Sequence, residues 1–150
     1  MNNKGFTLIE LVVSFSITVI MLGIVTVSFI SLERHSLIKS AYILRTNLRY
    51  CQKNAMEEKR KYEISLNVIE NLYYIKRADD SGLLRTISQV KLMPGVKFQT
   101  NATDKSIDFT PQGTTGDACT ITLSTNHYYL DMTINVGCGR VYIDKMGKLS

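Results

Sequence analysis

Residues 4–10 read Lys4-Gly5-Phe6-Thr7-Leu8-Ile9-Glu10, and an uncharged stretch from Leu11 to Leu32 follows them. At about 1.5 Å of rise per residue, a helix of this length spans the hydrocarbon core of a bilayer. A secretory signal peptide has a shorter apolar core, of about 7–15 residues, and a small-residue cleavage site after it. A plain single-pass anchor fits the length. It gives no reason for Glu10, because a carboxylate in the membrane costs several kcal/mol.

The stretch from Lys4 to Glu10 resembles the processing site of type IV prepilins and pseudopilins. The resemblance implies that a prepilin peptidase removes residues 1–5 as a leader, in which Lys4 carries the charge. The enzyme would cut after Gly5 and methylate the new N-terminal residue, Phe6. Glu10 would pair with the N-terminal amine of a neighbouring subunit during assembly, because two charges that are each costly in lipid become tolerable when paired.

The apolar stretch continues into an amphipathic stem. Small and apolar residues recur there at intervals of three and four, which predicts one stripe along a helix: Leu37, Ala41, Leu44, Leu48, Cys51 and Ala55. The sequence predicts a single helix from about Thr7 to about Arg60. Residues 6–32 would be its transmembrane and filament-core half, and residues 33–61 its stem. We expect the stripe to pack against the rest of the chain rather than against a coiled-coil partner.

Residues 62–150 predict a β-rich globular head, because apolar and polar residues alternate from Tyr62 to Val68. Further strands are expected at 72–77, 84–92, 96–100, 106–110, 118–124, 128–136 and 140–144. The segment Ala78–Gly82 is typical of a hairpin loop whose glycine takes a positive φ. The predicted fold class is therefore α+β.

Several short motifs of the stem and head are similar to the pattern of GspH/FimT-like minor pseudopilins. They are Leu44-x-x-x-Leu48-Arg49 with Ala55, Phe109-x-x-x-Gly113, Thr120-Ile121-Thr122-Leu123 and Gly139-Arg140-Val141. The basic C-terminal finish of that family is thinned here by Tyr142 and Asp144. The resemblance implies a long N-terminal α-helix packed on a small C-terminal antiparallel β-sandwich.

The net charge of +5 is concentrated on the stem, whereas residues 62–150 carry equal numbers of basic and acidic side chains. By the positive-inside rule, the basic stem would place the C-terminal side in the cytoplasm. The resemblance implies the opposite: a single-pass protein of the inner or cytoplasmic membrane, with its N-terminus cytoplasmic and its head extracytoplasmic. We follow the resemblance, because long domains translocate largely regardless of charge. After assembly the chain would lie in a surface or periplasmic filament.

The resemblance implies a structural subunit of a type IV pilus, competence or type II secretion filament. Its partners would be the prepilin peptidase and the other pilins or pseudopilins of a helical filament. An alternative is a DNA-binding minor pilin of a DNA-uptake pilus, in which Arg140, Lys145 and Lys148 contact phosphates. A third alternative is a membrane-anchored receptor or enzyme that never assembles.

The sequence offers little for catalysis. It contains no Gly-rich phosphate loop, Cys-x-x-Cys or His-Glu-x-x-His, so we expect no cofactor, no metal and no enzymatic activity. Of three cysteines, Cys119 and Cys138 would be able to pair in an oxidising compartment, although spacing alone does not establish the geometry. Cys51 is expected to be a small buried residue.

Overall fold

The computed structural model of the chain describes residues 7–102, 104–116, 118–144 and 146–149, without the side chains of residues 24–31. Within that part there is one helix, α1, Leu8–Glu58. The predicted helix is confirmed, with closely similar ends. Its C-terminal end is followed by Lys59, whose φ of 56° lies in the left-handed region that commonly terminates helices.

The chain divides into two compact units, residues 1–32 and residues 33–150, which are described separately. In the first unit, the hydroxyl groups of Ser14, Ser16 and Thr18 donate hydrogen bonds to carbonyl oxygens four residues earlier, at 2.8–2.9 Å. Each hydroxyl donor is therefore satisfied inside its own helix.

The predicted membrane-spanning segment comprises residues 6–32. Residue 6 and the side chains of residues 24–31 lie outside the described part of the chain. Among the residues that are described, no helix is long and apolar enough to cross a membrane.

Four strands form the first antiparallel sheet of the second unit, in the order β3-β2-β1-β5. Their bounds are Tyr62–Asn67 for β1, Leu72–Ala78 for β2, Leu84–Lys91 for β3 and Ser106–Phe109 for β5. The predicted hairpin loop joins β2 to β3, and its Gly82 has a φ of 83°. Asp79 Oδ1 fixes this loop by accepting hydrogen bonds from the backbone N–H groups of Ser81 and Leu83, both at 3.0 Å.

The second antiparallel sheet has the order β4-β6-β7-β8, with β9 paired to β7. The bounds are Lys97–Thr100 for β4, Cys119–Ser124 for β6, Tyr128–Ile134 for β7, Val141–Ile143 for β8 and Gly147–Lys148 for β9. Strand β9 was not predicted, because two residues are too few to show an alternating pattern. The strands β8 and β9 pair with opposite ends of β7: Ile134 faces Val141, and Tyr128 faces Lys148.

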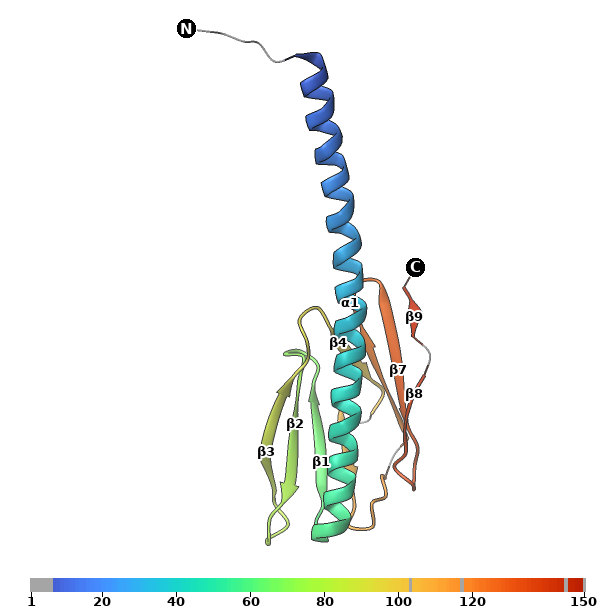
Figure 1. Cartoon of the computed structure of the whole chain (residues 1–150). Coiled ribbons are helices and arrows are strands. Elements are labelled where there is room, and N and C mark those ends of the chain that lie inside the picture. Colours follow the sequence, from blue (N-terminus) through green and yellow to red (C-terminus); the bar gives the residue numbers. More distant parts are fainter. Residues whose placement is uncertain (1–6, 103, 117, 145, 150) are drawn as a thin grey trace. The chain divides into compact units, whose positions relative to one another are not determined.

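One hydrophobic core joins the stem part of α1 to both sheets, which lie on different sides of the helix in Figure 1. Every residue of the predicted stripe is at most 1% exposed: Leu37, Ala41, Leu44, Leu48, Cys51 and Ala55. Large buried side chains reach the same core from both sheets, among them Tyr62, Tyr73, Phe98, Phe109, Ile121, Leu123 and Met132. The predicted α+β class is confirmed, and the stripe packs within the chain's own head.

We predict that Leu48→Ala lowers the free energy of unfolding by about 2–5 kcal/mol, because it removes a fully buried side chain and leaves a cavity. The matched control is Leu83→Ala, which truncates a leucine that is 63% exposed and should cost less than about 0.5 kcal/mol. Urea unfolding of the full chain in detergent, followed by circular dichroism, measures both values. Equal losses in the two variants would show that the stripe is not the core.

Candidate functional site

Thr7 and Glu10 form a reciprocal capping box at the start of α1. Glu10 Oε2 accepts hydrogen bonds from Thr7 N at 2.9 Å and from Thr7 Oγ1 at 2.8 Å. In return, the backbone N–H of Glu10 donates to Thr7 Oγ1 at 3.4 Å. These bonds satisfy backbone N–H groups that have no partner within the helix. Both bonds that Glu10 accepts end on Oε2, so Oε1 faces no competition from them for a further donor.

The resemblance to prepilins implies a role for Glu10 but none for Thr7. The pattern Thr7-Leu8-Ile9-Glu10 is a Thr-x-x-Glu capping box directly before an apolar stretch, and this signal was sufficient to find Thr7. The predicted processing residues Lys4, Gly5 and Phe6 lie outside the described residues.

The predicted DNA-contacting residues do not form one patch. Arg140 O accepts a hydrogen bond from Asn135 N at one end of β7, whereas Lys148 pairs with Tyr128 at the other end. At about 3.3 Å per residue of strand, the two basic residues are about 20 Å apart. Lys145 lies outside the described residues. Arg140 and Lys148 therefore lie apart, because β8 and β9 pair with opposite ends of the same strand, and their contact with DNA stays a prediction.

Gln52 of α1 joins two loops of the second unit to the stem. Its Nε2 donates to Gly113 O at 2.8 Å and to Cys138 O at 2.9 Å. Gly139 has a φ of 57°, and a Cβ added there would lie 2.6 Å from Gln52 Nε2. A Cβ added at Gly113, whose φ is 77°, would lie 2.6 Å from Met56 Sδ. The two glycines of the quoted motifs thus let these loops approach the helix.

Glu33 connects the start of the second unit to the loop between β6 and β7. Its Oε2 lies 3.0 Å from His127 Nδ1, and its Oε1 accepts a long hydrogen bond of 3.5 Å from Asn126 Nδ2. The hydrogen bond with His127 is the main cause that lowers the pKa of the Glu33 carboxyl. His127, between β6 and β7, therefore has a structural partner on α1.

The three cysteines lie in different environments. Cys119 is buried in β6 and Cys138 is exposed, and the described part of the chain contains no disulfide between them. Cys51 is buried as predicted, and burial raises the pKa of its thiol to about 12. A thiol with such a pKa stays protonated at neutral pH and is a poor nucleophile.

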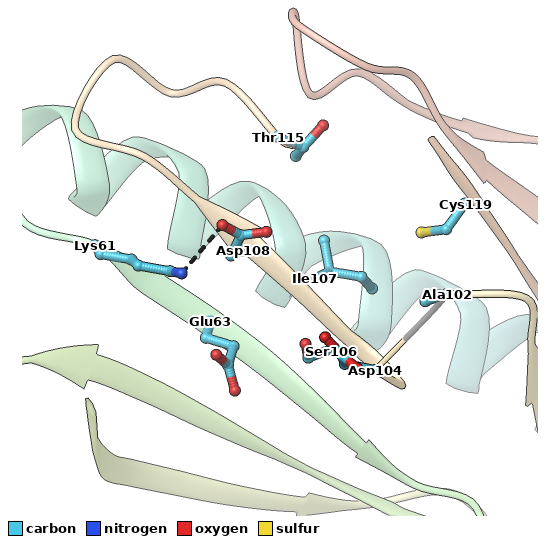
Figure 2. Close-up of a pocket in the computed structure, with 9 residues that line it drawn as sticks. All are labelled: Lys61, Glu63, Ala102, Asp104, Ser106, Ile107, Asp108, Thr115 and Cys119. Carbon is cyan, nitrogen blue, oxygen red and sulfur yellow. Dashed lines mark ion pairs between the residues drawn. The ribbon is translucent and has the colours of Figure 1, made fainter. Parts of the chain in front are cut away.

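Figure 2 shows a small pocket beside β1 and β5, with a volume of about 260 Å³ and three carboxylates in its lining: Glu63, Asp104 and Asp108. Two of them have lysine partners. Lys61 Nζ lies 3.2 Å from Asp108 Oδ2, and Lys76 Nζ lies 3.1 Å from Glu63 Oε1. Over the described ranges, no group of three His, Cys, Asp or Glu side chains is placed to hold a metal ion. We interpret the pocket as a salt-bridged surface of the first sheet.

Known proteins match this chain in two ways, by a sequence motif and by fold. Residues 1–26 match a family model described as the prokaryotic N-terminal methylation motif. The structure is similar to the type IV minor pilin FimU of Pseudomonas aeruginosa, with a TM-score of 0.62 and 18% identity over 75% of this chain and 91% of that chain. It is also similar to the minor pseudopilin EpsH of the Vibrio cholerae type 2 secretion system, with a TM-score of 0.62 and 10% identity over 72% and 95% of the two chains. No curated protein sequence matches the chain significantly.

We predict that Gly139→Ala destabilises the fold more than Gly137→Ala. Both glycines have a positive φ, of 57° and 80°, so both substitutions add backbone strain. Only at Gly139 would the new Cβ also meet Gln52 Nε2 and Gly113 O, whereas nothing lies within 4 Å of the corresponding position at Gly137. The difference between the two thermal midpoints isolates the contact with Gln52. Equal midpoints would contradict the close approach of the Gly139 loop to Gln52.

A second prediction concerns pH. The Glu33 carboxyl has a lower pKa in the fold than its usual value of 4.5, so it stabilises the fold above that value and ceases to do so as the pH falls through the folded pKa. We expect amide exchange at residues 125–127, corrected for its intrinsic pH dependence, to accelerate below about pH 4.5. The Glu33→Gln variant should lose this dependence. A similar acid response in both proteins would exclude Glu33 as its source.

Proposed function

We propose that this chain, which has the prokaryotic methylation motif at its N-terminus and the fold of minor pilins and pseudopilins, is a minor filament subunit handled by a prepilin peptidase. The proposal rests on the combination of the methylation motif and the fold in one chain. The motif, residues 1–26, includes the start of α1, and the stem of the same helix is part of the core of the head. The filament is a type IV pilus or a type II secretion pseudopilus, and the chain itself performs no catalysis.

Processing would begin at the leader. The peptidase would cut between Gly5 and Phe6, remove residues 1–5 and methylate the amine of Phe6. The capping box of Thr7 and Glu10 marks the start of α1 at Leu8, two residues after the new N-terminus.

Glu10 would act after processing. Its carboxylate is held at the helix start by Thr7, and a carboxylate has enough lone pairs to accept another donor at the same time. The methylated amine of Phe6 in a neighbouring subunit is such a donor. Pairing the two charges would offset the cost that each one has in lipid, so the pair would favour entry of the chain beside an existing subunit.

Residues 6–32 would hold the unassembled chain in the inner or cytoplasmic membrane, with the head on the extracytoplasmic side. Back-bonded hydroxyl groups at Ser14, Ser16 and Thr18 support this, since a polar group in lipid needs an internal partner. In the filament the same segment would pack among the corresponding helices of other subunits. The second unit, residues 33–150, would face the outside.

The proposal predicts different effects at Gly5 and Glu10. Gly5→Asp should leave the chain at precursor size, because the cleavage site is lost. Glu10→Val should be processed normally and yet be absent from filaments, because it has no charge to pair. The measurements are immunoblots of the membrane and of sheared filaments. Normal processing of the first variant or normal incorporation of the second would contradict the proposal.

Glu10→Gln provides a matched control for the capping box. Glutamine at this position still accepts from Thr7, so the helix start is retained while the charge is removed. If charge pairing drives assembly, Glu10→Gln should be incorporated as poorly as Glu10→Val. Full incorporation of Glu10→Gln would instead assign Glu10 to the helix cap alone.

A further inference from the structure

We infer that a groove between the stem of α1 and β8 binds a carboxylate side chain of a neighbouring subunit in the filament, an inference that rests on the proposed function. We call this the arginine groove. Its volume is about 550 Å³, and its lining is Arg45, Arg49, Gln52, Gly139, Arg140, Val141, Tyr142 and Ile143. Three arginines thus line the groove, two from the helix and one from the segment before β8.

The fold brings these arginines together although they are far apart in the sequence. Arg45 and Arg49 are one helical turn apart on α1, so they share a face. Gln52 lies on the same side of the helix. Its Nε2 donates a hydrogen bond of 2.9 Å to the carbonyl oxygen of Cys138 and so holds the loop that contains Cys138. That hydrogen bond places the following residues, Gly139 and Arg140, against the stem. The hydrogen bond that attaches this loop to the helix therefore also forms one side of the groove.

Arg45 gives independent support for a missing partner. Its Nε is buried and has no hydrogen-bond partner among the described residues. A buried N–H group of a cation that stays unpaired costs free energy, and most such groups in folded proteins are satisfied. An oxyanion in the groove would not reach this buried atom, but its negative charge would offset part of the cost through the rest of the Arg45 guanidinium group.

The chain's own carboxylates do not fill this role. Within the described residues, several other basic side chains form ion pairs, such as Arg60 with Asp80 and Arg77 with Glu58. None of these ion pairs includes Arg45, Arg49 or Arg140. Arg140 interacts with the side chain of Tyr142, and none of the three arginines has a carboxylate partner in the described part of the chain.

The surroundings favour a protein carboxylate over a nucleic acid. The guanidinium fork binds a carboxylate through two parallel hydrogen bonds. Val141 and Ile143 add apolar lining suited to the carbon atoms of an acidic side chain. A duplex needs several phosphate contacts along a basic surface, but Lys148 is about 20 Å away along β7 and the exposed Asp144 follows β8 directly.

The test measures binding of a fluorescein-labelled ten-residue glutamate peptide to the full chain in detergent, by fluorescence anisotropy at low and moderate salt. We expect saturable binding that weakens at least about ten-fold in Arg49→Gln and in Arg140→Gln, because each change removes a charged hydrogen bond. Lys148→Gln removes the same charge far from the groove and should bind as the unchanged chain does. Arg49→Lys keeps the charge but not the fork, so it should also bind more weakly.

Three outcomes would overturn the inference. They are the absence of peptide binding, equal weakening in all four variants, and binding of a twelve-base-pair duplex that is tighter than that of the peptide. Thermal unfolding of each variant checks that the fold is retained, and Arg45 is left unchanged because its buried Nε makes its substitution ambiguous.

Failure of the proposed function is detected separately. Processing and incorporation of the unchanged chain report on that proposal and do not involve the groove. If the chain enters filaments but the peptide does not bind, the inference fails and the function stands. If the peptide binds through the groove but the chain is neither processed nor incorporated, the proposed function fails, and with it the neighbouring subunit as the source of the carboxylate.

Discussion

The small and apolar residues of the stem, from Leu37 to Ala55, leave water only if the chain folds back and covers them. Two sheets share this task, and each would have an unburied apolar face without the helix. The stem is therefore part of the head's core and not a stalk beneath it. Gln52 and the two glycines at 113 and 139 follow from that arrangement, because loops that approach a helix so closely must hydrogen-bond to it and omit a Cβ.

Much of the fold was predictable because its pattern is local. Residues at spacings of three and four gave the stem, and alternation gave the strands that pack on it, with ends close to those observed. Strand β9 was missed because it is two residues long and depends on pairing with β7. The pairing order of the strands was not predictable either, since it is set by contacts between residues distant in the sequence.

Among the candidate sites too, those that depend on local sequence were predictable and those that depend on contacts between distant residues were not. Thr7 was recoverable from the Thr-x-x-Glu pattern, because a capping box acts within one turn of helix. Arg140 and Lys148 are near each other in the sequence, but they lie apart in the fold because β8 and β9 pair with opposite ends of β7. Conversely, no sequence pattern indicated that Arg140 would line the same groove as Arg45 and Arg49, since that requires the helix and β8 to lie side by side.

The central claim is that one chain combines a processed N-terminus with a stem helix that is the core of its head. Intact mass spectrometry of the chain recovered from native membranes tests it most directly, because a single mass reports both cleavage and methylation. The account predicts a chain that begins at Phe6, lacks residues 1–5 and carries one added methyl group on its N-terminal amine. A chain that retains residues 1–5, or that is cut elsewhere, would contradict the account.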